Sequence, residues 1–386
     1  MKGIYILSII ISFTLALIFN PSVVLGHKVG DDLGSFNKQW QEFKRSSNEE
    51  WGKYSQEQND KWDRFEKEQN DKWLKFKADV EKKWNTFMDS TKKTWVDYSK
   101  DLNARSRVDF EKGIIEVEAI VPTSSKDVKK QGEQEICRQV KKMFSMRNPA
   151  GMKVLKDQIK NKKGRVITDK NLDTFIKKDV APSIKVAAKP YVSADGVKRV
   201  KFRMNLSLVP DHVRIRAARY IPIVSRDAER FNVEPELIMA IIHTESYFNP
   251  MAKSSAGALG LMQLMPRYAA RESYNFLYKK DAILTPSYLY IPENNIELGC
   301  TYLYLLRNKH LKGVYDPVKK QYLVICAYNW GPGAIQRKIV ARHDIDHMSR
   351  YDLYILLETR TPQETRNYLK RVTKRINIYK RLFQQT

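Results

Sequence analysis

The segment Pro235-Glu-Leu-Ile-Met-Ala-Ile-Ile-His-Thr-Glu-Ser246 places a carboxylate on the apolar face of a predicted helix. Pro235 suits the first turn of a helix, and Leu237, Ile241 and Glu245 follow at steps of four residues, so they share one face. Burial on that face would disfavour the charged carboxylate and keep a proton available near neutral pH, as a general acid requires. On helix position alone, a helix-terminal glutamate that reaches solvent is the commoner interpretation.

Helical spacing continues on both sides of this segment, from about residue 210 onward. Apolar and aromatic residues recur at helical intervals in residues 215–230, 295–307 and 321–328, between loops rich in Gly, Pro, Ser and Asn. We therefore predict a mainly α-helical domain over residues 207–386 and expect the chemistry to lie there.

Three further motifs follow the glutamate and decide between its two interpretations. They are Ala256-Gly-Ala-Leu-Gly-Leu-Met-Gln-Leu-Met-Pro266, Ala327-Tyr-Asn-Trp-Gly-Pro-Gly333 and Thr361-Pro-Gln-Glu-Thr-Arg-Asn-Tyr-Leu369. Together with Glu245-Ser-Tyr-Phe-Asn-Pro250, they resemble in order and spacing the motifs of the lysozyme-like lytic transglycosylases. Four blocks in order make the resemblance specific, and it implies a lysozyme-like catalytic domain.

The resemblance covers about residues 100–386 and is greatest to the murein transglycosylase C branch of that family. It extends upstream through Val108-Asp-Phe-Glu-Lys-Gly-Ile-Ile115. Three features depart from that branch: its lipid-attachment cysteine is missing, an eleven-residue repeat is extra, and Trp330 stands where a small residue often follows the Ala-Tyr-Asn block. Because the lipid-attachment cysteine is missing, any membrane association is expected to occur without a lipid anchor.

The resemblance also implies a reaction on peptidoglycan. Glu245 corresponds to the single acid/base that protonates the oxygen between MurNAc and GlcNAc and then takes a proton from the MurNAc C6 hydroxyl, which leaves a 1,6-anhydroMurNAc end. Neither a metal nor a cofactor is implied. The implied substrate-binding residues are Ser254, Gln263, Met265, Tyr328, Asn329 and Tyr368, and the supporting residues are Ser246 and Glu364.

Two other functions stay open on the sequence. A hydrolytic muramidase would use water in place of the C6 hydroxyl and would need a second carboxylate to activate it. A non-catalytic peptidoglycan-binding scaffold is the alternative outside enzymes, and the presence of Glu245 within a complete set of motifs argues against it.

Residues 36–100 contain an aromatic repeat with a period of eleven residues. Its members are Trp40, Trp51, Trp62, Trp73, Trp84 and Trp95, followed three positions later by Phe43, Tyr54, Phe65, Phe76, Phe87 and Tyr98. The spacing predicts one long helix over the whole segment, with a right-handed supercoil. Because the apolar stripe is too narrow to stabilise a lone helix, we expect self-association or packing along another surface, with sugar stacking and a membrane-lying helix as alternatives.

Residues 101–206 read as a small α+β domain. Lys112-Gly113 lies between two β-branched runs, as in a hairpin, and residues 197–209 form another β-like run. Helix-like stretches lie near residues 126–146 and 170–180. The whole chain is therefore predicted to be α+β, with a long N-terminal helix, this small domain and the helical catalytic domain.

The first residues predict export to the periplasm or cell envelope. Lys2, the apolar run of residues 4–19 and a small-residue ending at Gly26 read as a signal peptide over residues 1–26, with a retained membrane anchor as the alternative. The net charge of +25 suits a polyanionic partner such as the cell wall or a membrane face, and export argues against nucleic acid.

The cysteines predict no metal site. Cys137, Cys300 and Cys326 lack metal-ligand spacing and read as buried free thiols, with a Cys300–Cys326 disulfide as the alternative.

Overall fold

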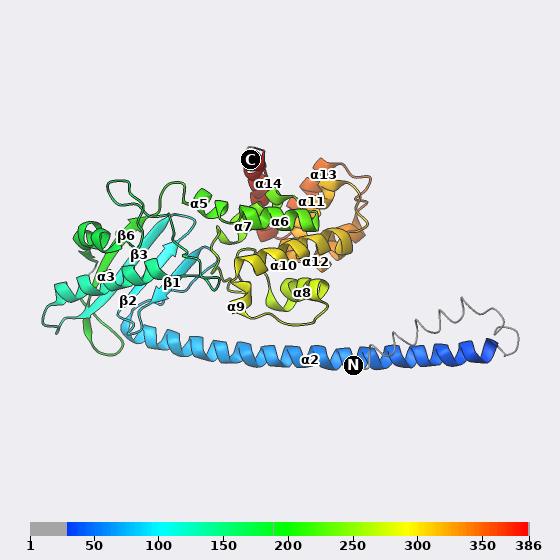
Figure 1. Cartoon of the computed structure of the whole chain (residues 1–386), viewed down its shortest axis with the longest axis horizontal. Helices are drawn as coiled ribbons and strands as arrows, with labels where there is room; N and C mark the ends of the chain where they lie inside the picture. Colours follow the sequence, from blue (N-terminus) through cyan, green and yellow to red (C-terminus); the bar gives the residue numbers. More distant parts are fainter. Residues whose placement is uncertain (1–28, 188, 385–386) are drawn as a thin grey trace. The chain divides into compact units, whose positions relative to one another are not determined.

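The computed structural model describes residues 29–187 and 189–384, with side chains described from residue 37 onward (Figure 1). The chain divides between Asp63 and Arg64 into two compact units. The predicted signal peptide, residues 1–26, lies outside the described residues. Within the described part of the chain, no helix is both long enough and apolar enough to cross a membrane.

Helix α2, Val29–Lys83, carries most of the aromatic repeat, as the spacing predicts. In the first unit the side chains of Trp40, Phe43, Trp51 and Tyr54 are all exposed, by 37% to 49%. Trp40 stacks on Phe43 with ring centroids 5.7 Å apart. A single helix cannot cover its own aromatic stripe, so this stretch keeps an apolar surface in contact with solvent.

The prediction that the helix continues to residue 100 is wrong after Lys83. The last two copies of the repeat are Trp84 with Phe87, in irregular chain, and Trp95 with Tyr98, in strand β1, Thr94–Tyr98. Trp84 is 1% exposed, packs edge-on against Tyr98 and donates a hydrogen bond from Nε1 to the carbonyl of Leu102 at 2.8 Å. Pairing with a neighbouring strand and burial of these rings outweigh the local helical pattern.

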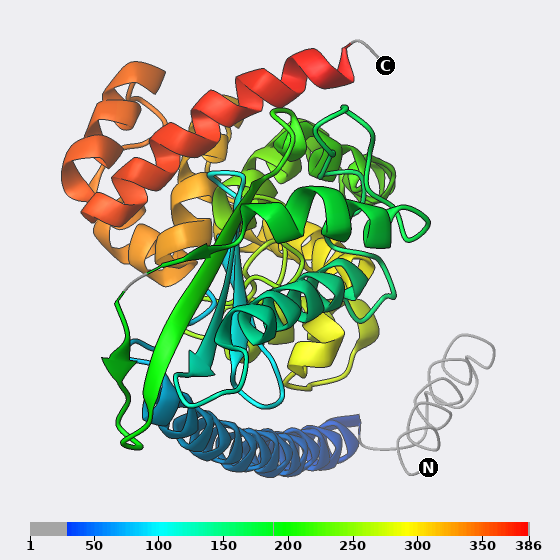
Figure 2. The same cartoon turned by 90° about the vertical axis from the view of Figure 1, so that its left-hand side faces the viewer.

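The sheet is antiparallel and has the order β1-β2-β3-β6-β4, with β5 also paired to β6. The remaining strands are β2 (Ala104–Asp109), β3 (Ile114–Pro122), β4 (Lys185–Val186), β5 (Tyr191–Val192) and β6 (Lys198–Ser207). The hairpin predicted around Lys112-Gly113 is confirmed, and Gly113 has a φ of 67°. Helix α3, Val128–Ser145, packs across one face of the sheet (Figure 2). Short helical turns follow it: α4 (Leu172–Phe175), η2 (Ile176–Val180) and η3 (Ala181–Ser183).

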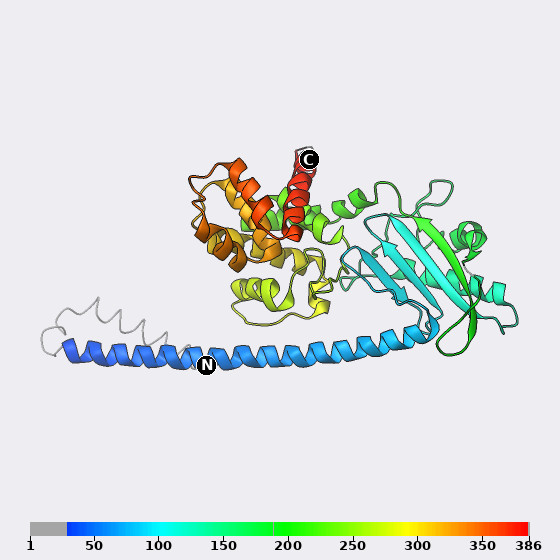
Figure 3. The ribbon, with the colours of Figure 1, turned by 180° about the vertical axis from the view of Figure 1, so that it is seen from behind.

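The rest of the chain is helical, as predicted, and lies beside the sheet (Figure 3). Its elements are α5 (His212–Ala218), α6 (Ile221–Phe231), α7 (Pro235–Ser246), η4 (Pro266–Ala270), α8 (Arg271–Tyr278), α9 (Pro286–Leu289), α10 (Pro292–Leu305), η5 (Leu306–His310), α11 (Pro317–Trp330), α12 (Pro332–Lys338), η6 (Val340–Arg342), α13 (Arg350–Arg360) and α14 (Gln363–Phe383). Residues 237–242 of α7 are all buried, so this helix forms the centre of the core instead of exposing one polar face. Helix α14 packs along it.

The two buried cysteines of the helical domain, Cys300 and Cys326, are free thiols. Burial raises the pKa of both, to about 12 for Cys326, which keeps them protonated and unreactive. The structure therefore has free thiols in place of the alternative disulfide.

Candidate active site

Glu245 lies one residue before the end of α7 and is 5% exposed. Burial raises the pKa of its carboxyl group, and the charge of Glu364 acts in the same direction. The ammonium group of Lys92 and the hydroxyl of Tyr368 lower that pKa in opposition. The balance is a raised pKa, which is the property expected of a general acid that must hold a proton near neutrality.

The end of α7 is shaped by two consecutive residues in the left-handed region. Tyr247 has a φ of 51° and Phe248 a φ of 60°. Such conformations cost on the order of 1–3 kcal/mol each in a non-glycine residue, so the surroundings must hold them in place. Phe248 is fully buried and stacks on Tyr220, and the carbonyl of Tyr247 accepts a hydrogen bond from Arg216 Nε at 3.0 Å.

Arg216 ties this helix end to the α+β region. Its guanidinium is buried and also donates to the carbonyl of Phe110 at 2.7 Å and to Oε1 of Gln158 at 2.6 Å. Burial lowers the pKa of Arg216 to about 9. One side chain thus holds together the hairpin turn, the loop after α3 and the residue that follows the catalytic helix.

Two tyrosines flank Glu245. Tyr328 on α11 donates from its hydroxyl to the carbonyl of Met262 at 2.8 Å. Tyr368 on α14 is 2% exposed, and its hydroxyl makes no hydrogen bond of normal geometry. It is nevertheless close enough to Glu245 that each group shifts the pKa of the other. Burial and the charge of Glu245 raise the pKa of both phenols well above its usual value, so both stay neutral. The Tyr328 proton is already donated to Met262, which leaves the Tyr368 hydroxyl able to donate.

The Gly-Leu-Met-Gln turn is held by hydrogen bonds of its own loop. Gln263, with a φ of 51°, donates from Nε2 to the carbonyls of Ala252 and Gly260, while its Oε1 is buried without a partner. Ser254 Oγ accepts from the amide of Ala258 at 2.9 Å. Both side chains are therefore partly committed to the loop, and Gln263 Oε1 is a buried acceptor without a partner.

Asn295 on α10 supports the same turn, and the sequence interpretation missed its role. It is fully buried, accepts from the amide of Met262 at 2.8 Å and donates to the carbonyls of Leu259 and Leu289. A Cβ at Gly260, where φ is 77°, would lie 2.3 Å from Asn295 Nδ2, so only glycine allows this approach. A buried amide among apolar helix positions is the signal that could have revealed it.

The remaining predicted residues lie in different surroundings. Asn329 accepts a hydrogen bond at its Oδ1 from Thr365 at 2.8 Å, and Met265 is half-buried at the start of η4. Ser246 is fully buried and donates to the carbonyl of Ile242 in its own helix, which is a structural contact. Glu364 is exposed in the first turn of α14, and it reaches the site through its charge.

Lys92 is the neighbour of Glu245 that no sequence signal indicated. Its Nζ lies 3.2 Å from Glu245 Oε2, across 153 positions of the chain. The periodicity placed Lys92 in a continuous helix, whereas it lies in the turn between α2 and β1.

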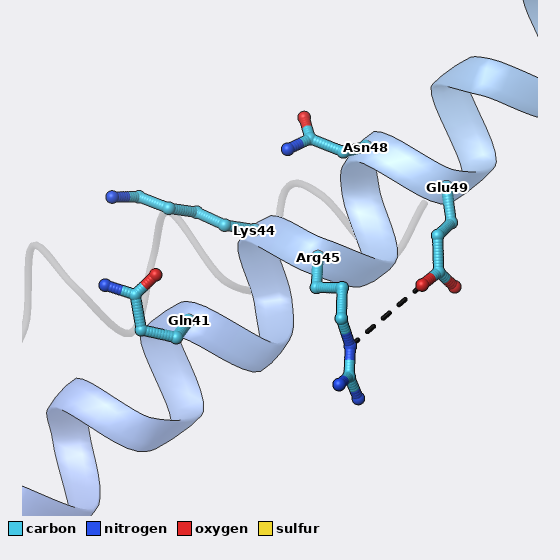
Figure 4. A pocket seen from close by; sticks show the side chains of 5 residues that line it. All are labelled: Gln41, Lys44, Arg45, Asn48 and Glu49. Carbon is cyan, nitrogen blue, oxygen red and sulfur yellow. Dashed lines mark ion pairs between the residues drawn. The ribbon is translucent and has the colours of Figure 1, made fainter.

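A hollow on the first unit does not have the features of a ligand site. It is lined by Gln41, Lys44, Arg45, Asn48 and Glu49, all from one face of α2 (Figure 4). Arg45 and Glu49 approach to 4.0 Å, and both are largely exposed. Ligand sites are concave, with apolar walls and a few polar groups that converge on the ligand. This surface has neither apolar walls nor converging polar groups.

Comparisons with known proteins match two parts of the chain. Residues 222–347 match the family described as transglycosylase SLT domain, and residues 63–140 match the N-terminal domain of membrane-bound lytic murein transglycosylase C. The second match begins upstream of residue 101, where the small domain was predicted to start, and it includes the turn that carries Lys92.

Two curated relatives are each named membrane-bound lytic murein transglycosylase C. The protein of Pectobacterium atrosepticum is 40% identical over 188 residues, which are 47% of this chain and 52% of the relative. That of Haemophilus ducreyi is 41% identical over 179 residues, 44% of this chain and 48% of the relative. The chain thus matches only about half the length of these relatives.

Two solved structures are also similar over part of the chain. The lytic transglycosylase Slt of Pseudomonas aeruginosa is 28% identical, with a TM-score of 0.36, over 42% of this chain and 24% of that one. The 70 kDa soluble lytic transglycosylase of Escherichia coli is 26% identical, with a TM-score of 0.36, over 45% of this chain and 26% of that one.

Proposed function

Because the chain contains a transglycosylase SLT domain preceded by a murein transglycosylase C N-terminal domain, we propose that it is a lytic transglycosylase of peptidoglycan. Its substrate would be the β-1,4 bond between MurNAc and GlcNAc, and its products would carry 1,6-anhydroMurNAc ends. The observation that carries this proposal is the buried Glu245, which lies inside the matched range 222–347 and has two neutral tyrosines beside it, Tyr328 within that range and Tyr368 after it.

In the proposed first step, the carboxylic acid of Glu245 gives its proton to the glycosidic oxygen. The bond from that oxygen to MurNAc C1 breaks, and the GlcNAc residue leaves as an alcohol. In the second step the carboxylate takes the proton of the MurNAc C6 hydroxyl, whose oxygen bonds to C1. The acid is thereby restored, no water is consumed, and one carboxyl group serves both steps.

The other residues would bind and orient the sugars. Tyr328 and Tyr368 are neutral beside Glu245 and would hold the acetamide group of MurNAc while excluding water, Tyr368 by donating to its oxygen and Tyr328, whose proton is donated to Met262, by accepting from its N–H. The free oxygen of Gln263, with Ser254, would hydrogen-bond a sugar hydroxyl. Asn329 and Met265 would line the groove in which the glycan strand binds.

The proposed setting is the cell envelope, where the substrate lies. The two relatives are named as membrane-bound proteins, and the predicted signal peptide would export this chain. The glycan strands would be its main partner, and the exposed aromatic stripe of α2 would allow a second copy to bind.

The test is mass spectrometry of the muropeptides released from purified peptidoglycan. We expect 1,6-anhydroMurNAc ends from the wild-type chain and no release by Glu245→Gln. Release of only reducing MurNAc ends would identify a muramidase and contradict the proposal. Binding of peptidoglycan without any release by the wild-type chain would identify a scaffold.

A further inference from the structure

Lys92 lies in a tight turn that is built by its neighbours. The amide of Thr91 donates to the carbonyl of Thr94 at 2.9 Å, and the two threonine hydroxyls are 2.8 Å apart. The amide of Thr94 in turn donates to Thr91 Oγ1 at 3.1 Å. These bonds close the turn directly before β1, so Lys92 is presented from an ordered backbone.

The next residue fastens this turn to the end of the catalytic helix. Lys93 Nζ lies 2.8 Å from both carboxylate oxygens of Glu111 and 4.9 Å from the ring centre of Tyr247, and its carbonyl accepts from the amide of Phe110. Glu111 also accepts a hydrogen bond from the Tyr247 hydroxyl at 2.6 Å. Since Tyr247 is two residues from Glu245, these contacts fix the position of the turn relative to the acid.

The ion pair between Lys92 and Glu245 is asymmetric in its exposure. The glutamate side chain is 7% exposed, whereas that of Lys92 is 36% exposed at the solvent side of the site. The other titratable groups that act on Glu245 are Tyr328, Tyr368 and Glu364. Of these, the tyrosines are neutral and Glu364 is negative, so Lys92 brings the positive charge.

We propose that Lys92 is a positioning residue for Glu245, contributed to the active site by the N-terminal matched region. This inference rests on the proposed function. When the acid gives its proton to the glycosidic oxygen, negative charge develops on a buried carboxylate, and the ammonium group 3.2 Å away stabilises it. The charge disappears when the proton of the C6 hydroxyl is taken up, so Lys92 acts in both steps without exchanging a proton.

The proposal predicts a specific change in the pH dependence. The positive charge lowers the pKa of Glu245 against the effect of burial, so removal of the charge raises that pKa further. A general acid works only while protonated, and the alkaline limb of the activity profile should therefore move to higher pH. At the same time the limiting kcat should fall, because the charge that develops on the carboxylate is no longer compensated.

The experiment compares Lys92→Met and Lys92→Arg in the full chain, with Lys100→Met as the matched control at an exposed lysine nearby. The carboxyl of Glu245 is titrated by carbon-13 NMR with labelled glutamate, and Glu245→Gln identifies its signal. For Lys92→Met we expect a titration midpoint higher by about one pH unit, and a limiting kcat lower on the order of tenfold with little change in KM. Lys92→Arg should retain most of both properties, and Lys100→Met should match the wild type.

The outcomes separate this proposal from the proposed function. An unchanged titration midpoint and an unchanged kcat in Lys92→Met would overturn it. Equal losses of kcat in Lys92→Met and Lys92→Arg without a shifted midpoint would also overturn it, since that pattern indicates a structural role. A shifted midpoint in a chain that releases no anhydro products would support the coupling of Lys92 to Glu245 while refuting transglycosylase activity.

Discussion

Replacing Asn295 by leucine tests whether this buried amide holds the Gly-Leu-Met-Gln turn. The two side chains have the same branched skeleton of four heavy atoms, so the substitution removes the hydrogen bonds while keeping the branching of the side chain. It takes the acceptor from the amide of Met262 and the donor from the carbonyls of Leu259 and Leu289, at 2.8, 3.0 and 2.9 Å. Leu259 keeps a second bond, from the amide of Leu264.

Two buried backbone groups, Met262 N and Leu289 O, would thus lose these partners. Each buried group left unsatisfied costs about 1–3 kcal/mol, so the free energy of unfolding should fall by roughly 2–6 kcal/mol. For a domain of this size that corresponds to a Tm lower by roughly 10 °C. Activity should fall as well, because the carbonyl of Met262 accepts the hydroxyl of Tyr328 at 2.8 Å.

Circular dichroism with thermal and urea unfolding would measure the effect. Asn294→Leu is the matched control, since the neighbouring amide makes one longer bond, to the carbonyl of Tyr288 at 3.3 Å, and is only partly buried. If Asn295→Leu and Asn294→Leu differ by less than about 0.5 kcal/mol, the surroundings satisfy these groups in another way and the reasoning is refuted.

Four further predictions concern Glu245, its neighbour Glu364 and the aromatic repeat. Glu245→Gln should retain the fold and glycan binding while cleavage falls by on the order of a hundredfold or more, since the amide cannot donate the proton; a loss within tenfold in a muropeptide assay would mean that another group is the acid. Because burial raises the pKa of Glu245, the protonated carboxyl contributes its full stabilisation of the folded state at pH values below the ordinary pKa of 4.5. This contribution is lost as the pH rises through the pKa of the folded state. The Tm of Glu245→Gln should therefore exceed that of the wild type above neutrality but not in acid, and a pH-independent difference would contradict the stated cause. Glu364→Gln should leave the ratio of anhydro to reducing MurNAc ends unchanged, because this carboxylate is exposed and one carboxyl group serves both proposed steps; a lower share of reducing ends in the variant would instead reveal Glu364 as a second catalytic carboxylate. Alanine at the exposed aromatic residues of the first unit should abolish concentration-dependent sedimentation and leave cleavage unchanged, and a chain that sediments as a monomer before substitution would refute self-association. These residues are Trp40, Phe43, Trp51 and Tyr54.

The start of α7 follows from local sequence. Pro235 occupies its first turn, and the apolar residues after it drive burial. The hairpin at Gly113 is equally local, because a positive φ in a short turn suits glycine. Such features depend on residues a few positions apart, and a sequence displays those directly.

The aromatic repeat shows where local periodicity stops being sufficient. Copies of the same spacing form α2 up to Lys83, yet Trp95 and Tyr98 form part of strand β1. The difference comes from β2, which pairs with β1, and from a small core in which Trp84 and Tyr98 pack with Ile120. Those partners are supplied by other parts of the chain, so the period alone could not predict the end of the helix.

The active site divides in the same way. The sequence by itself placed Glu245 on the apolar face of a helix, because the spacing of four residues is a property of the helix, but that spacing left open whether its side chain reaches solvent. The structure shows that it is buried. Only the tertiary structure decided which charge would stand beside it. Lys92 reaches Glu245 because the turn before β1 is fastened by Lys93 and Glu111 to Tyr247, and an ion pair across 153 positions depends on how the two regions pack rather than on any local pattern.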